Sequence, residues 1–372
     1  MRLAIVLLLT CGCRQIFGID QPRLADSGLP PDDGSIDAPD APDAAPLCFS
    51  RPELDFGACL SHVPTMSFSV TAPVSFDTDQ NGPAACETTL LSQSQNMCVI
   101  AATDVTVSAA VTVTGSRPLV IFATGTIAID ATVDVASHAA GSTRGPGENP
   151  SVCGTAGQGM IGGGGAGGSF TTGGGDGGNG GQVNAVGGPR AAAFTVQTFH
   201  GGCRGGLGGN GAAGVAYGGG ALALVANQVT IDNAINASGA AGVGAAAGAR
   251  GGYGGGTGGM ILIDAPSVSV GAQMQMFAIG GAGGGGSSLS VSGNQGAEAT
   301  SYSGSIPGGQ GGNTGGDGGS AYPSPQNGQQ AAGQNAGGGG GAGGAGAIVI
   351  YTNSSLNSGS LKISPQAITH AY

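Results

Sequence analysis

Residues 119–137 read LVIFATGTIAIDATVDVAS, and this stretch decides the fold that the sequence predicts. It opens with a short apolar run, and two pairs of alternating apolar residues follow, separated by turns. β-branched residues that alternate along short runs are typical of strands with one buried face. The same arrangement recurs in copies that begin at Val99, Leu222, Met260 and Ile348.

The repeat predicts an all-β solenoid. One copy cannot bury its inner face alone, but stacked copies can, and five copies exceed the minimum of about three. The period is about 22 residues without insertions, which is longer than the roughly 18 residues of a left-handed coil built from hexapeptides. We therefore expect a short right-handed parallel β-helix. The alternative is a β-sandwich of the same strands, which needs hairpins between them.

Long glycine-rich insertions interrupt the repeat at 136–220, 238–259 and 279–347. Each follows the third strand of a copy, so we expect all of them to leave the solenoid at one corner and to cover one side. Insertions on one face of a repeat protein often form its binding surface.

Glycine supplies 80 of the 372 residues, mostly in these insertions. Two interpretations remain open. Glycine loses much entropy on ordering, which favours flexible loops. Glycine also allows extended helices with three residues per turn to approach closely, as they do in collagen.

The N-terminus resembles that of an exported lipoprotein. Met1-Arg2 precedes the short apolar run 3–9, which is typical of a signal peptide and too short for a membrane span. Cys13 follows Gly12 directly after this run, as in a bacterial lipobox, and Arg14 follows it where an inner-membrane protein would have Asp. This predicts a lipid anchor on Cys13 and an outer-membrane or cell-surface location. The alternative is ordinary secretion.

These patterns predict the organisation of the chain. We expect a signal peptide at 1–12, an anchor with a disordered Asp/Pro/Ala-rich tether at 13–47, and a small disulfide-containing cap at 48–98. The glycine-rich solenoid is expected at 99–365 and a tail at 366–372.

Six further cysteines suggest disulfides, because the chain is predicted to be exported. A zinc site would need closely spaced pairs such as C-x2-C, which the sequence lacks. The simplest pairing by spacing is Cys48–Cys59, Cys86–Cys98 and Cys153–Cys203.

Composition argues against several functions. The net charge is -11, charged residues make up 8% of the chain, and there is no Trp. Nucleic-acid binding needs a basic surface and is not expected. No cofactor motif is recognisable, since the P-loop needs a lysine that the glycine stretches lack.

Few residues are candidates for chemistry. Asp77, Asp79 and Asn81 imitate the start of a calcium-binding loop, but the Glu expected at its twelfth position is missing. An Asp/Asn turn explains them as well. We expect no catalytic residues, and the histidines show no metal-ligand spacing. Four acids on or beside the expected strands would carry an enzymatic alternative: Asp130, Asp134, Asp232 and Asp264.

The chain resembles the glycine-rich lipoproteins common in myxobacteria. The resemblance rests on CRQIFGID from Cys13, the tether, the paired cysteines, the stretch at 119–137, and GGMILIDAPSVSV around Met260. It implies location and architecture only, since that family has no established activity. We therefore expect a non-catalytic envelope or surface protein, structural or adhesive, with a membrane and envelope polysaccharide or surface proteins as partners. The alternative is a carbohydrate-active β-helix enzyme.

Overall fold

The computed structural model describes residues 46–80, 86–87, 90–211, 214–356 and 361–372. In these ranges the protein is all-β, and its strands lie mainly in parallel sheets.

Helical structure is confined, within the described residues, to two short 3-10 turns. They are η1 (Pro52–Leu54) and η2 (Ala140–Ser142).

Successive copies of the repeat pair in parallel and form three sheets, here called sheets I, II and III. Each of the four complete copies gives one strand first to sheet III, then to sheet I, then to sheet II. Sheet I contains, in spatial order, β16 (Ser267–Val270), β13 (Gln228–Ile231), β10 (Thr126–Ile129), β7 (Val105–Val107) and β3 (Phe68–Val70). Sheet II contains β19 (Ile363–Ser364), β17 (Gln275–Phe277), β14 (Ala234–Asn236), β11 (Val133–Asp134), β8 (Val111–Thr114) and β4 (Val74–Asp77). Sheet III contains β20 (Ile368–His370), β18 (Ala347–Tyr351), β15 (Met260–Asp264), β12 (Ala221–Val225), β9 (Leu119–Ala123) and β6 (Cys98–Ala102).

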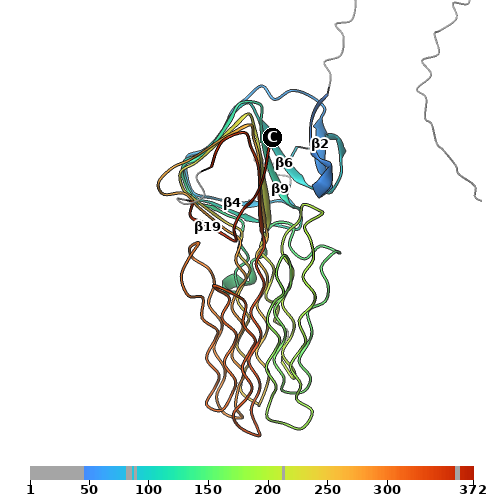
Figure 1. Cartoon of the computed structure of the whole chain (residues 1–372), viewed down its shortest axis with the longest axis vertical. Coiled ribbons are helices and arrows are strands. Elements are labelled where there is room, and N and C mark those ends of the chain that lie inside the picture. The colour runs from blue at the N-terminus through green and yellow to red at the C-terminus, as the bar shows by residue number, and fades with distance from the viewer. Residues whose placement is uncertain (1–45, 81–85, 88–89, 212–213, 357–360) are drawn as a thin grey trace, which may run out of the picture. The chain divides into compact units, whose positions relative to one another are not determined.

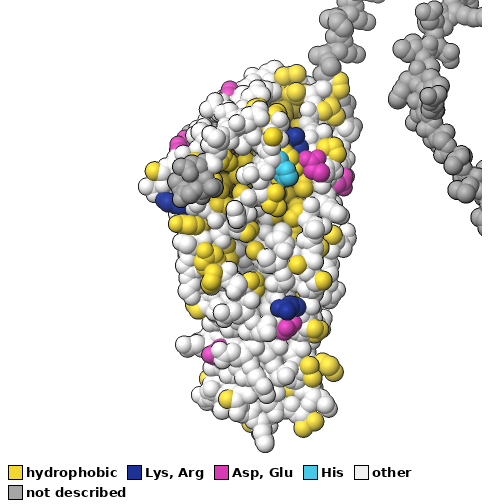
Figure 2. All heavy atoms as spheres, in the orientation of Figure 1, with side chains coloured by type: hydrophobic (Ala, Val, Ile, Leu, Met, Phe, Trp, Pro, Cys, Tyr) yellow, Lys and Arg dark blue, Asp and Glu magenta, His cyan; other side chains and the backbone are white. Residues whose placement is uncertain are grey.

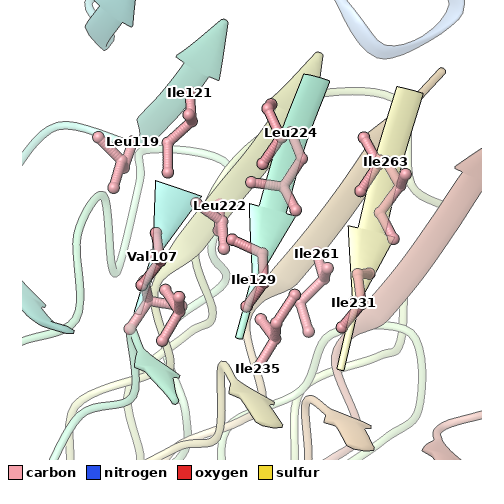
Figure 3. Packing of buried hydrophobic residues seen from close by; sticks show 14 of the residues in the cluster. Val107, Leu119, Ile121, Ile129, Leu222, Leu224, Ile231, Ile235, Ile261 and Ile263 are labelled. Atoms are coloured by element: carbon pink, nitrogen blue, oxygen red, sulfur yellow. The ribbon is translucent and has the colours of Figure 1, made fainter. Parts of the chain in front are cut away.

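Equivalent residues of successive copies lie beside one another in the core. Ile121 pairs with Leu224, Leu224 with Ile263, and Ile263 with Ile350. Figure 3 shows three of these side chains within the buried cluster that the three sheets enclose. Burying each such side chain contributes roughly 1.5–3 kcal/mol, so the repeated column stabilises the stack.

Four neighbouring strands of sheet III, β9, β12, β15 and β18, are buried on both faces, which explains their nearly continuous apolar sequences. The outer face of this sheet is covered by an antiparallel sheet of β1 (Leu47–Arg51), β2 (Phe56–Leu60) and β5 (Leu90–Gln93). The ring of Phe49 on β1 stacks on Phe122 of β9 with centroids 5.2 Å apart. The N-terminal region therefore packs on the outside of the three parallel sheets, whose stacked copies are here called the coils.

The parallel sheets take in residues that precede 99. β3 and β4 pair with β7 and β8 of the next copy. The alternation in Phe68-Ser69-Val70 and in Val74-Ser75-Phe76 supplies these two strands.

All three insertions leave at the same corner, as the sequence predicts. They connect β11 to β12, β14 to β15, and β17 to β18, so each runs from sheet II to sheet III. Figure 1 shows their segments running away from the coils and back, side by side.

Candidate functional site

The glycine-rich insertions are joined by backbone hydrogen bonds in three directions. Residues 251–259 donate in turn to three neighbouring segments, 203–209, 338–344 and 237–243. Since every third residue faces the same neighbour, the segment turns once in about three residues, as in polyproline II. The donor–acceptor pairs are Gly251–Gly209, Gly252–Gly338, Tyr253–Val243, Gly254–Gly206, Gly255–Gly341, Gly256–Ala240, Thr257–Cys203, Gly258–Gly344 and Gly259–Ala237.

A second segment shows that the insertions form one body. Residues 337–346 donate to 278–287 of their own insertion and to 162–168 of the first. These hydrogen-bonded segments, residues 162–168, 203–209, 237–243, 251–259, 278–287 and 337–346, are together called the glycine bundle. Of the two interpretations that the sequence left open, the structure has the packed one.

Steric crowding explains why glycine fills the bundle. A Cβ atom built on Gly254 would overlap the carbonyl oxygen of Ala166, and one on Gly340 would overlap that of Tyr253. These obstacles are backbone atoms of hydrogen-bonded neighbours, so they cannot swing aside as a flexible side chain can. The glycine repeats are therefore a packing requirement at these positions.

The bundle ends in a set of turns on the side away from the sheets, here called the distal turns. They include 160–163, 181–186, 246–249 and 287–291 (Figure 1). Backbone and amide contacts link neighbouring turns to one another. These contacts are Met160 N to Val186 O at 2.8 Å, Gly248 N to Ser288 O at 2.9 Å, and Gln182 Nε2 to Ala249 O at 3.4 Å.

Aliphatic side chains are exposed at the distal turns. Val183 is 84% exposed and Leu289 63% exposed. Ile161 is also exposed and has a φ of 52°, a left-handed conformation that is strained for a β-branched residue. The surrounding turns hold this strained residue at the surface, and such strain often marks functional positions. The exposed aliphatic set is Met160, Ile161, Val183, Val186, Leu289 and Val291.

The distal end is almost free of charge. The stretches 157–163, 181–188, 242–251 and 284–297 contain one charged residue, Arg250. Figure 2 shows that the visible face is largely uncharged at the end farthest from the coils, with hydrophobic side chains there. Such a surface suits an uncharged partner.

His138 joins the coils to the base of the bundle. Its Nε2 lies 3.2 Å from Asp134 Oδ2, and its Nδ1 lies 2.9 Å from Glu298 Oε2 in the third insertion. Hydrogen bonds to Asp134 and then to Glu298 raise the pKa of His138 to about 10, against the effect of burial. The imidazole is therefore charged at neutral pH and donates from both nitrogens.

Glu298 is the partner that sequence reasoning missed. It also accepts from the backbone N–H of Ala139 at 2.6 Å. Burial raises the pKa of its carboxyl group, but the hydrogen bonds from His138 and Ala139 outweigh this and lower it. A pair separated by 160 residues carries no local signal in the sequence.

His200 lies in an apolar place. It is 4% exposed and stacks on Phe170 with ring centroids 4.8 Å apart. Burial lowers its pKa, so the ring is neutral at neutral pH.

The four acids of the enzymatic alternative are in different environments. Asp130 and Asp232 are exposed after β10 and β13, and Asp134 is bound to His138. Asp264 is buried on sheet III, where burial raises the pKa of its carboxyl group although the Arg51 guanidinium opposes this.

Arg51 holds Asp264 with two hydrogen bonds. Its Nε and Nη2 lie 2.9 and 2.5 Å from the two carboxylate oxygens. The guanidinium also lies over the rings of Tyr351 and Tyr372, 4.2 and 4.9 Å from their centroids. This arrangement clamps β1 to β15 and gives the buried carboxylate a charged partner.

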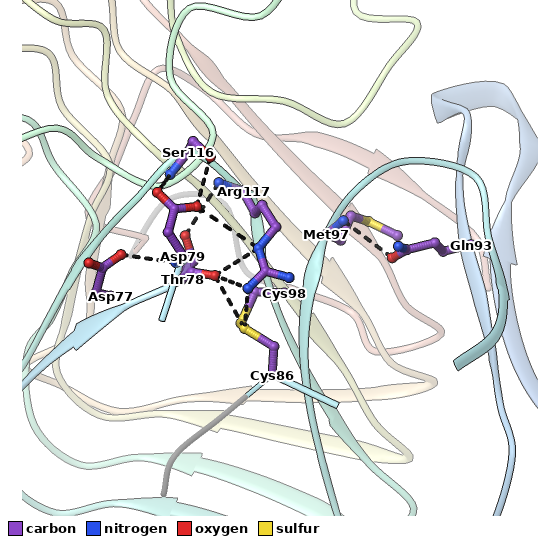
Figure 4. The surroundings of a disulfide bond; sticks show 9 residues. All are labelled: Asp77, Thr78, Asp79, Cys86, Gln93, Met97, Cys98, Ser116 and Arg117. Carbon is purple, nitrogen blue, oxygen red and sulfur yellow. Dashed lines mark hydrogen bonds and ion pairs between the residues drawn. A yellow bond between two sulfur atoms is a disulfide. The ribbon is translucent and has the colours of Figure 1, made fainter. Parts of the chain in front are cut away.

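The calcium candidates form a turn. Asp77 Oδ1 accepts from the backbone N–H of Asp79 at 2.9 Å. The carboxylate of Asp79 accepts from the backbone N–H and the hydroxyl of Ser116, both at 2.7 Å (Figure 4). Asn81 lies outside the described residues. The two described carboxylates are thus engaged by the protein itself.

Among the described residues, three disulfides are present, in the pairing that spacing favoured. They are Cys48–Cys59, Cys86–Cys98 and Cys153–Cys203. The first joins β1 to β2, the second ties Cys86 to the first residue of β6 beside Arg117 (Figure 4), and the third lies within the first insertion. Cys13, the predicted lipidation site, lies outside the described residues.

The described part of the chain holds neither a metal-binding cluster nor a membrane-spanning helix. It contains no group of three or more His, Cys, Asp or Glu side chains placed to hold a metal ion. None of its helices has the length and apolarity to cross a membrane.

Comparison with known proteins gave no relative: no family model, curated protein or solved structure matches this chain.

Proposed function

We propose that the chain is a non-catalytic protein of the cell envelope or cell surface, anchored to the outer membrane through a lipid on Cys13. In this proposal a short right-handed parallel β-helix carries the glycine bundle, and the distal turns make a structural or adhesive contact.

The bundle is the observation that carries the proposal. Backbone hydrogen bonds in three directions fix each segment against its neighbours, so the distal turns are held on a rigid base. Rigid elements position binding residues better than free loops do. Exposed aliphatic side chains on an almost uncharged end are what an adhesive surface for an uncharged partner requires.

The pairing of the repeat supports the β-helix. Each complete copy contributes one strand to each of three parallel sheets around a common core. Connections between parallel strands of one sheet are right-handed in nearly all proteins, which supports the handedness.

The positions of the acids do not favour the enzymatic alternative. Hydrolysis of a glycosidic bond usually needs two carboxyl groups, one on either side of the bond. Asp264 is clamped by Arg51 and Asp134 by His138, on different sheets.

The adhesive contact can be tested with a binding screen. The purified full chain is exposed to soluble and insoluble polysaccharides with calcium, and both binding and release of reducing ends are scored. We expect binding without release. The double variant Val183→Asp/Leu289→Asp should lose binding, because a contact at the distal turns would then have to remove two charged carboxylates from water. Val74→Asp on β4 is the matched control and should bind normally.

Release of reducing ends would contradict the non-catalytic proposal. Binding that survives in the double variant would contradict the role of the distal turns. Absence of binding to every polysaccharide would exclude such polymers as partners and leave the structural role. The anchor has a separate test: Cys13→Ala should move the chain from the membrane fraction to the soluble fraction.

A further inference from the structure

An apolar cavity opens at the end of the coils where the first strands lie. Its volume is about 300 Å³, and its walls come from β3, β4 and the two copies that follow. Phe68, Phe76, Ile100 and Ile121 are among its lining residues. This site is separate from the glycine bundle.

Side-chain size along sheet II explains why the cavity exists. The paired inward column reads Val74, Val111, Val133, Ile235 and Met276 from the open end onward. The three valines line the cavity, and the larger residues follow deeper in the stack. In this column the short side chains of the first copies leave space unfilled.

Exposure follows the same gradient. Val74 is 40% exposed at the rim, Ile121 is 5% exposed two layers deeper, and Leu224 in the next copy is fully buried. The ends of solenoids are usually closed by polar capping elements. Here the antiparallel sheet packs on the outer face of sheet III, so among the described residues it does not fill this mouth.

The lining chemistry selects a hydrocarbon. Among the described residues, no charged side chain lines the cavity, and Ser69 and Thr71 supply the only side-chain hydroxyl groups there. Cavities with apolar walls exclude water and take up apolar molecules; a documented cavity of half this volume binds benzene. A charged or strongly polar ligand would lose its hydration without gaining a partner.

The shape of the cavity selects a slender molecule. Its lining spans three neighbouring strands of sheet II, β4, β8 and β11. With strands about 4.8 Å apart, the cavity is about 10 Å deep and roughly 30 Å² in mean cross-section. A second copy of the chain would present the same hollow and leave both unfilled. A single extended chain of methylenes fits better.

We propose that this cavity binds one unbranched acyl chain of a membrane lipid or of the fatty acid derived from it, with the polar head group in solvent. The acyl chain would occupy the apolar space that the short valine side chains of the first copies do not fill.

The test uses the full chain carrying Cys13→Ala, so that no acyl group of its own competes. Saturated fatty acids of increasing length are titrated by calorimetry below their micelle-forming concentrations. We expect one site and a negative heat-capacity change. Affinity should rise roughly fourfold per added methylene until the cavity is filled, and then level off.

Two variants locate the site. Val74→Asp places a charge at the rim and should weaken binding at least tenfold, with an unchanged circular dichroism spectrum. Val183→Asp is the matched control on the distal turns and should bind as the parent does. If it also loses binding, or if Val74→Asp does not, the proposal is overturned.

Other occupants give distinct results, each of which would overturn the proposal. Binding that appears only after deletion of residues 81–85 would make the chain itself the occupant. Binding by the Cys13→Ala chain but not by the lipid-carrying chain would make the chain's own anchor the occupant. Affinity that rises without a plateau would indicate adsorption outside the cavity. The polysaccharide screen is independent of all these outcomes.

Discussion

The coils and the glycine bundle belong to one chain but are stabilised in different ways. The coils enclose a column of large aliphatic side chains, such as Ile231, which is fully buried. The bundle buries few large side chains for its length and is held largely by backbone hydrogen bonds to several neighbours at once. The coils need large side chains to fill their core, whereas the bundle needs positions without a side chain. Removing carbon atoms should therefore destabilise the coils, and adding them should destabilise the bundle.

Removing carbon from the coils should have the largest effect. Ile231→Ala leaves a hole between copies and should lower the free energy of unfolding by about 2–5 kcal/mol. Urea unfolding measures this. Val183→Ala, which shortens an exposed side chain, is the control and should change stability by less than about 0.5 kcal/mol. Equal effects of the two substitutions would mean that the column of buried residues does not stabilise the stack.

Adding carbon to the bundle should come next. Gly254→Ala forces a methyl group against the carbonyl oxygen of Ala166 and should cost about 1–3 kcal/mol, as overpacking does. Gly154→Ala is the matched control, because its Cβ would lie 3.6 Å from the nearest side chain, at ordinary contact distance. The same assay applies, and a Gly254→Ala chain as stable as the control would show that the bundle is loosely packed.

The contrast between the two regions also sets what the sequence could predict. Alternating residues such as Ile127 and Ile129 mark strands locally, and the repeated position of the insertions marks their common corner. Adjacent cysteines indicated the disulfide pairs. The glycine stretches carry no such signal, because no side chain identifies which segment lies beside which. Glu298 lies 160 residues from His138 and Arg51 lies 213 residues from Asp264, so only the fold brings these pairs together.

A pH-dependent effect is expected at the joint between the two regions. The pKa of His138 is about 10 in the folded protein, above its ordinary value of 6.5. A raised pKa means that the folded state holds the proton more tightly than the unfolded state does. The contribution of the charged His138 to the free energy of unfolding is therefore complete below pH 6.5. It should fade as the pH rises from 6.5 to 10. His138→Gln should remove this part of the pH dependence.

Chemical unfolding at a series of pH values measures the difference. The parent chain should lose its advantage over His138→Gln across that range. A constant difference between the two chains from pH 6.5 to 10 would contradict the ion pairs of His138 with Asp134 and Glu298. As the pH falls below 4.5, the ordinary pKa of a Glu carboxyl group, protonation of Glu298 should remove the same contact. The parent chain should therefore lose its advantage over His138→Gln at acid pH as well.

Amide hydrogen exchange on the full chain tests the central claim most directly, namely that the glycine bundle is a packed structure. Backbone N–H groups in hydrogen-bonded structure exchange only when it opens. The account predicts that the amides of 251–259 and 338–344 exchange orders of magnitude more slowly than an unstructured peptide, on the scale of the sheet III amides at 221–225. Exchange of the glycine amides at the unstructured rate, while 221–225 stays protected, would contradict it.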